Sequence, residues 1–145
     1  PERVNKLVLI GAAFGGDTYV SAFSSVLNSE LIFTTFANLT FGLKYKAVNP
    51  TPEHWPVFRD KLYDLWKTPC YLPTTPGQHC LAPLANINSD TLVMVGKNEI
   101  IEFAHTEEIV AEIAGAELEV VALAGHFLPE IRPFKTANLI LDFIQ

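Results

Sequence analysis

The sequence has few basic residues, few cysteines and no long apolar run. Its 10 Lys and Arg residues are outnumbered by 16 Asp and Glu residues, and its formal net charge is −6. Because no basic cluster is present to neutralise phosphate groups, we expect neither nucleic acid nor an anionic membrane as a partner. Apolar runs such as residues 7–10 are far shorter than the roughly 20 residues that span a bilayer. We therefore expect no transmembrane helix.

Only two cysteines occur, Cys70 and Cys80. Their spacing is not that of a zinc or haem motif, and we expect no metal and no cofactor. The default interpretation is two free thiols in a reduced cytosol, and a disulfide closing residues 71–79 is the alternative for an exported chain. The first residues do not resemble a signal peptide, so we expect a cytoplasmic location.

Three largely apolar segments predict buried parallel strands, at residues 5–11, 91–96 and 118–123. Between the second and third, Thr106 is predicted to cap a helix that ends at Gly115. Another helix is predicted over residues 134–144. A strand-helix-strand unit of this length is the usual crossover between parallel strands. The pattern therefore predicts an α/β fold, and 49% hydrophobic residues are enough to build its core.

The segment between the first and second predicted strands is too long for a crossover of one helix, so it must fold by itself. Asp17 is predicted to cap a helix, and Thr51-Pro52 to open another. Residues 31–43 between them are apolar on almost all sides, and the proline-rich residues 68–83 are predicted to return in extended form. This gives an α/β portion at 1–13 and 86–145, with a helical insertion at 14–85.

His126 is the strongest candidate for chemistry. It follows the third predicted strand in Gly125-His126-Phe127 and precedes the last predicted helix. A histidine on a tight turn at the end of a buried strand is well placed to transfer protons, although a structural role with the ring bonded to backbone is the alternative. No G-x-S-x-G turn occurs in the 145 residues. The sequence thus contains a candidate base without the nucleophile that it would serve.

The order of these features resembles the C-terminal part of an α/β-hydrolase fold. The resemblance rests on Val95-Gly96-Lys97-Asn98-Glu99-Ile100-Ile101 after one strand and Gly125-His126-Phe127-Leu128-Pro129-Glu130-Ile131-Arg132-Pro133 after the next. Residues 1–11 resemble the strand that follows the nucleophile-bearing helix in that family, and the helical insertion lies where its lid usually does. The resemblance covers the whole chain. It implies a partial parallel sheet of about three strands, flanking helices and a helical lid.

The resemblance also implies roles for particular residues. His126 matches the catalytic histidine, and Glu99 matches the triad acid, for which Glu is accepted in this fold. A solvated charge at the end of a strand is the alternative for Glu99, and Glu102 is a weaker candidate acid. Four aromatic residues of the lid are implied to shape an apolar substrate site, with packing inside the lid as the alternative: Phe36, Phe41, Trp55 and Phe58.

The expected function is that of a C-terminal portion of an enzyme that hydrolyses an ester, a small amide or a related bond of a small apolar or moderately polar substrate. Alone it should be inactive, because nucleophile and oxyanion donors are missing. One alternative is a non-catalytic interaction module, with a homodimer through strand 5–10 or the lid helices. A small complete hydrolase using Cys70 or Cys80 as an unusual nucleophile is a weaker alternative.

Overall fold

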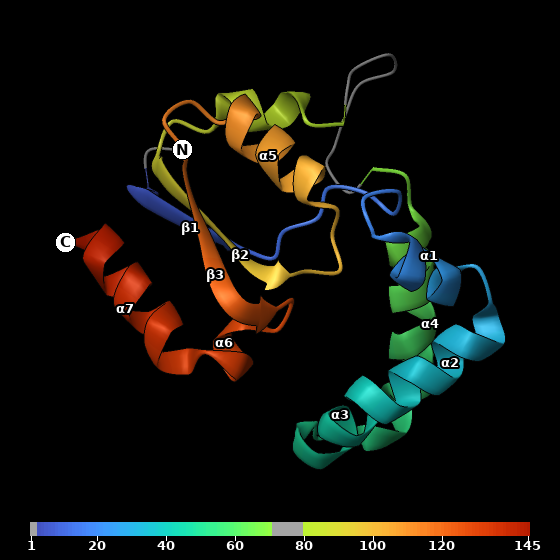
Figure 1. Cartoon of the computed structure of the whole chain (residues 1–145). Helices are drawn as coiled ribbons and strands as arrows, with labels where there is room; N and C mark the ends of the chain where they lie inside the picture. The colour runs from blue at the N-terminus through green and yellow to red at the C-terminus, as the bar shows by residue number, and fades with distance from the viewer. Residues whose placement is uncertain (1–2, 71–79) are drawn as a thin grey trace. The chain divides into compact units, whose positions relative to one another are not determined.

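The computed structural model describes residues 3–70 and 80–145. The chain divides into two compact units, an α/β unit of Pro1–Phe14 with Leu72–Gln145 and a helical unit of Gly15–Tyr71 (Figure 1). The sequence-based boundaries of 1–13 with 86–145 and of 14–85 place Phe14 and residues 80–85 differently. Leu81 and Leu84 lie in the core of the α/β unit, which explains why this segment belongs there.

The α/β unit contains a parallel sheet of three strands. They are β1 (Lys6–Ile10), β2 (Asp90–Asn98) and β3 (Glu117–Gly125), in the spatial order β1-β2-β3. The apolar runs predicted the positions and the parallel pairing of these three strands correctly. The predicted burial holds only for residues 91–96 of β2, because β1 has no fully buried residue and β3 has only Val121 and Ala124. Because β2 is the central strand of a sheet that helices cover on both faces, its residues 91–96 are all buried, which is why this run shows no alternation of polar and apolar residues.

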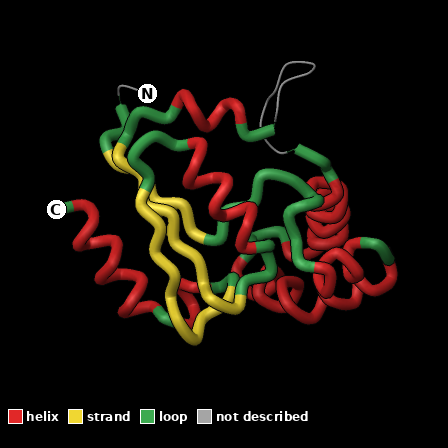
Figure 2. Tube along the Cα trace, turned by 45° about the horizontal axis from the view of Figure 1, so that its top comes forward, coloured by secondary structure: helices red, strands yellow, loops and turns green. Residues whose placement is uncertain are grey.

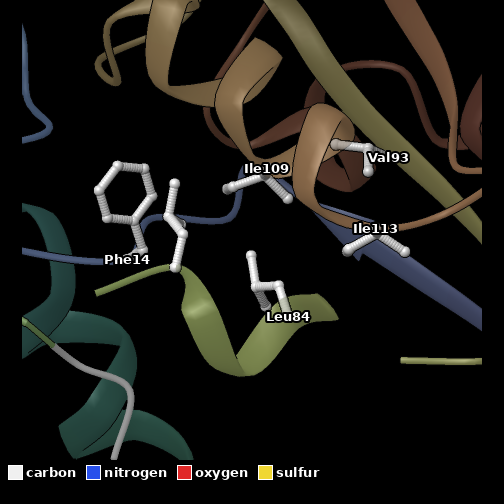
Figure 3. Close-up of a cluster of buried hydrophobic side chains, with 6 residues drawn as sticks. Phe14, Leu84, Val93, Ile109 and Ile113 are labelled. Atoms are coloured by element: carbon white, nitrogen blue, oxygen red, sulfur yellow. The ribbon is translucent and has the colours of Figure 1, made fainter. Parts of the chain in front are cut away.

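Helices cover both faces of this sheet (Figure 2). On one face, Val93 of β2 packs with α5 (Phe103–Glu112) and with the 3₁₀ helix η3 (Ala82–Asn86). Figure 3 shows this cluster, to which Phe14, Leu84, Ile109 and Ile113 belong together with Val93; in this view Phe14 lies at the opposite end from Val93. On the other face, Leu92 and Met94 pack against α6 (Leu128–Ile131) and α7 (Pro133–Ile144). Each fully buried aliphatic side chain contributes about 1.5–3 kcal/mol to stability.

The prediction for the start of α5 was wrong. The helix begins at Phe103, with Glu102 at the N-cap position, so Thr106 lies inside the helix and is buried. Thr106 shares one helical face with Ile109 and Ile113, so the apolar face extends one turn further towards the N-terminus than predicted. The last helix was predicted to within one residue, as α7.

The helical unit contains four α-helices, α1 (Ser21–Leu27), α2 (Glu30–Ala37), α3 (Leu43–Val48) and α4 (Trp55–Lys67). A π-helix, η1 (Asn38–Gly42), joins α2 to α3 without a break, and a 3₁₀ turn, η2 (Pro52–His54), precedes α4. Thr51-Pro52 therefore opens a 3₁₀ turn that leads into the predicted helix. The prediction that Asp17 caps a helix was wrong, because Val20 occupies the N-cap position of α1.

Aromatic side chains form the interior of the helical unit. Phe33 and Trp55 are almost fully buried, and the Phe33 ring lies 4.6 Å from that of Tyr63. Phe23 contacts Trp66 edge to face at 5.7 Å. Such pairs add roughly 0.5–1.5 kcal/mol each beyond the area that they bury. Packing inside this unit therefore accounts for a large part of its aromatic content.

Two further findings concern expectations from composition. Cys70 and Cys80, the two cysteines of the chain, are both disulfide-bonded, so the prediction of free thiols was wrong. A disulfide requires the two Cβ atoms to lie within about 4.5 Å of each other, a condition that sequence spacing does not encode.

Most of the segment 68–83, predicted to be extended, lies outside the described residues. None of the described helices is both long and apolar enough to span a bilayer.

Candidate active site

His126 stands immediately after β3, on a turn that leads into α6. The ladder between β2 and β3 is irregular here, with a register shift between Gly96 and Asn98. Leu123 has a φ of 55°, in the left-handed region that an L-residue rarely adopts. Its carbonyl oxygen accepts a hydrogen bond of 3.2 Å from Nε of Arg132. This bulge directs the end of β3, and with it the histidine, towards the end of β2.

Glycine is required where the two strand ends meet. A Cβ atom at Gly96 would lie 2.6 Å from the carbonyl oxygen of Ala124, and one at Gly125 would lie 2.8 Å from the carbonyl oxygen of Asn98. Real Cβ atoms essentially never approach other atoms so closely. The close approach of the two backbones brings the residue after Asn98 next to the residue after Gly125.

Those two residues are Glu99 and His126, and their side chains meet. Nδ1 of His126 lies 2.7 Å from Oε1 of Glu99, which also accepts a hydrogen bond of 2.7 Å from the backbone N–H of Ile100. The Glu99 side chain is 5% exposed and the His126 side chain 28%. Since a carboxylate oxygen can only accept, Nδ1 carries the proton and donates it. The lone pair of Nε2 is then available to accept a proton from another group.

Gly11, at the end of β1, completes this arrangement from a third direction. Its φ is +54°, and its N–H donates a hydrogen bond of 3.0 Å to the carbonyl oxygen of Met94. A Cβ atom at this position would lie 3.0 Å from Nδ1 of His126 and 3.4 Å from Oε2 of Glu99. From the sequence, Gly11 was expected only to end a strand. Its role beside the His–Glu pair was missed, and a glycine at a strand end is a weak signal for it.

The second carboxylate oxygen of Glu99, Oε2, differs from the first in its hydrogen bonding. Oε2 is buried and accepts no hydrogen bond from any residue that the structure describes. A buried polar atom without a partner costs about 1–3 kcal/mol. The two hydrogen bonds that Oε1 accepts, from Ile100 and His126, act against this cost and hold the carboxylate in place.

The other candidate acids, bases and ligands lie elsewhere. Glu102, the alternative acid, is an exposed residue at the start of α5. His105 lies within α5 rather than before it, and its Nδ1 is 3.1 Å from Oε2 of Glu108. His54 belongs to η2, while His79 lies outside the described residues. Within residues 3–70 and 80–145, no three His, Cys, Asp or Glu side chains gather to hold a metal ion.

Three of the four aromatic residues proposed to bind substrate share one cavity in the helical unit. Phe41, Trp55 and Phe58 line a cavity of about 330 Å³ together with Lys44, Tyr45, Leu62 and Trp66. Phe36 is not among the lining residues. It packs edge to face against Phe23 at 5.7 Å and Phe41 at 5.8 Å, as expected for a core residue.

The wall of this cavity is built around Trp55. Its indole N–H donates a 2.6 Å hydrogen bond to Oδ1 of Asn38, in the first turn of the π-helix. A Cβ atom at Gly42, in the same π-helix, would lie 3.0 Å from the indole ring. The indole's polar atom is thus satisfied inside the protein, and the cavity is lined almost entirely by apolar atoms.

Comparison with known proteins gives a consistent result at the level of the fold. No protein-family model matches the sequence, and no curated protein is significantly similar to it in sequence. Solved structures do match. NosK from Streptomyces actuosus superposes with a TM-score of 0.64 at 25% identity, over 99% of this chain and 59% of NosK. A serine hydrolase involved in carbazole degradation, the CarC enzyme, gives 0.63 at 14% identity, over 97% of this chain and 54% of its own.

The carboxylesterase CesB (YbfK) from Bacillus subtilis also matches, with a TM-score of 0.56 and 20% identity over 99% of this chain. These proteins are α/β-hydrolases. The chain has the fold of the C-terminal part of an α/β-hydrolase. It spans a little over half the length of these solved structures. In this portion of the fold, the ends of β1, β2 and β3 bring Gly11, Glu99 and His126 together.

Proposed function

We propose that this chain supplies the histidine and the acid of an α/β-hydrolase active site, with His126 as general base and acid and Glu99 as the residue that orients it. One observation carries the proposal: the 2.7 Å contact between Nδ1 of His126 and Oε1 of Glu99. A carboxylate in this position fixes the imidazole tautomer and stabilises the imidazolium ion that forms during catalysis.

In the proposed mechanism, Nε2 of His126 takes the proton of a nucleophile as that nucleophile attacks a carbonyl carbon. The same nitrogen then gives the proton to the leaving group. The nucleophile and the oxyanion donors would belong to sheet strands and loops outside these 145 residues, which contain no G-x-S-x-G motif. We expect the 145-residue chain alone to leave esters uncleaved above the background rate.

The substrate proposed for the complete protein is an ester or a related acyl compound with an apolar group. The cavity of the helical unit supports this, because its volume of about 330 Å³ suits a small ligand and its lining is apolar. Two of the solved structures bear names in keeping with such chemistry, a carboxylesterase and an N-acyl homoserine lactone degrading enzyme. In this proposal the helical unit acts as a lid, with Phe41, Trp55 and Phe58 as substrate-binding residues and Phe36 behind Phe41.

The test uses the gene upstream of this segment. A polypeptide extended towards the N-terminus through a G-x-S-x-G motif should hydrolyse p-nitrophenyl esters, and Glu99→Gln should lower kcat by about 10⁴-fold, as loss of the acid does in other triads. His105→Gln is the matched control, because His105 also pairs with a glutamate and should leave kcat unchanged. Full activity in His126→Ala, or an upstream sequence without any nucleophile turn, would refute the proposal.

A non-catalytic interaction module is the second candidate. Within the described part of the chain, β1 has β2 as its neighbour on one side only, so it forms an edge of the sheet. Strand edges recruit other polypeptides. A protein starting directly before Pro1 that forms stable dimers through β1, without hydrolytic activity, would favour this candidate.

A further inference from the structure

The helical unit has an apolar stripe along the outside of its longest continuous helix. From Glu30 to Val48, α2, η1 and α3 follow one another without a break. One face of this helix is buried in its own unit through Phe33, Ala37 and Gly42. The opposite face exposes Leu31, Leu39 and Leu43 by 77%, 71% and 69%. With Thr35, these residues form a row at intervals of four, which we call the leucine stripe.

The π-helix keeps this row straight. On an α-helix with 3.6 residues per turn, each interval of four rotates the side chain by about 40° around the axis. A π-turn takes more residues per turn, because its hydrogen bonds join residues i and i+5. The interval from Leu39 to Leu43 crosses η1, so the stripe turns back there instead of continuing around the helix. Three leucines therefore face solvent on one side of the unit.

The two ends of the stripe carry opposite charges. Exposed Glu30 lies at its N-terminal end, and exposed Lys44 and Lys46 lie at its C-terminal end. A second copy packed antiparallel would place the acidic end of each helix beside the basic end of the other. Leu31 would lie roughly opposite Leu43 of the second copy, with Thr35 and Leu39 near the symmetry axis. A parallel arrangement would instead bring like charges together, which opposes association.

We propose that the leucine stripe is a self-association surface, on which a second copy of this chain packs in antiparallel orientation about a two-fold axis. Such an interface is self-complementary, since each copy offers the same patch. One helix from each copy forms an interface at the small end of the range for specific complexes. We therefore expect a dissociation constant on the order of 10 μM, so that dimerisation depends on concentration within an accessible range.

The first experiment is sedimentation velocity of the whole chain from about 1 to 300 μM, a range chosen to bracket that dissociation constant. The wild-type protein should shift from monomer to dimer, and Leu39→Glu should weaken dimerisation at least tenfold. Leu65→Glu is the matched control, since Leu65 is also an exposed leucine of the helical unit but lies on α4. This control should dimerise as the wild type does, and circular dichroism should show both variants folded.

The second experiment tests orientation by exchanging charges. Glu30→Lys makes both ends of the stripe basic, and the double variant Lys44→Glu, Lys46→Glu makes both ends acidic. Each should dimerise less well alone, and a mixture of the two should form heterodimers. A wild-type protein that stays monomeric throughout would overturn the proposal, as would a dimer that Leu39→Glu leaves intact. The proposal would also be overturned if the mixed charge variants associated no better than either variant alone.

Discussion

Replacing Gly11 with alanine should damage the candidate active site and lower stability at the same time. The φ of +54° would place alanine in the left-handed region, which costs an L-residue about 1–2 kcal/mol. The new Cβ atom would also lie 3.0 Å from Nδ1 of His126. The imidazole would have to move by a few tenths of an ångström, lengthening its 2.7 Å hydrogen bond to Glu99. A weakened hydrogen bond to a charged group adds up to about 1.5–3 kcal/mol.

Gly115→Ala is the control for this prediction. Gly115 also has a positive φ, +74°, but a Cβ atom there would meet nothing within 4 Å. It should therefore carry only the conformational cost of about 1–2 kcal/mol. The difference between the two variants measures the contact with the His–Glu pair.

Two probes separate the units in a urea titration of either variant. Both tryptophans of the chain, Trp55 and Trp66, belong to the helical unit, so their fluorescence reports its unfolding alone. The Nδ1–H proton of His126, observed by NMR, reports the site in the α/β unit. Gly11→Ala should shift this resonance and Gly115→Ala should not. The role assigned to Gly11 would be refuted if the α/β unit lost equal stability in the two variants and the chemical shift of the His126 Nδ1–H proton stayed unchanged.

Two further substitutions test other features of the structure. Gly42→Ala should lower the stability of the helical unit by about 1–3 kcal/mol, because its Cβ atom would meet the Trp55 ring at 3.0 Å. The unfolding transition followed by tryptophan fluorescence should therefore move to a lower urea concentration. An unmoved transition would show that the Trp55 ring can shift to make room. Leu123→Gly should raise the stability of the α/β unit by about 1 kcal/mol, because Leu123 has a φ of 55° and an exposed side chain. Amide hydrogen exchange of β2 should then become slower. Faster exchange would show that the Leu123 side chain stabilises the unit by more than its backbone conformation costs.

The sequence was a good guide to the sheet and to His126 for a physical reason. Parallel strands of a sheet that helices cover on both faces carry apolar runs, and the run is clearest in β2, where residues 91–96 are all buried. The turn after such a strand is then easy to locate, and Glu99 and His126 both occupy such turns. Glu99 and His126 meet because neighbouring parallel strands have their C-terminal ends at the same end of the sheet.

Other features depend on contacts between distant residues and left no local signal. The position of Gly11 beside His126 requires β1 and β3 to flank β2 in a particular register. The assignment of Leu81 and Leu84 to the α/β core depends on packing against α5, which the prolines around them obscure. The π-helix arises where Trp55 packs against Gly42, and no pattern within residues 38–42 indicates it.

The glycine at position 96 has a consequence for how the central strand finds its place. Residues 91–95 of β2 are apolar or small and are buried on both faces, so a shift of the strand by one residue would change its hydrophobicity profile very little. A shift would, however, bring Val95 or Lys97 to the point where the carbonyl of Ala124 leaves no room for a side chain. Gly96 thus selects one register of β2 among several that would bury nearly the same apolar residues. The spacing from Gly96 to Glu99 then determines the position of the Glu99 carboxylate.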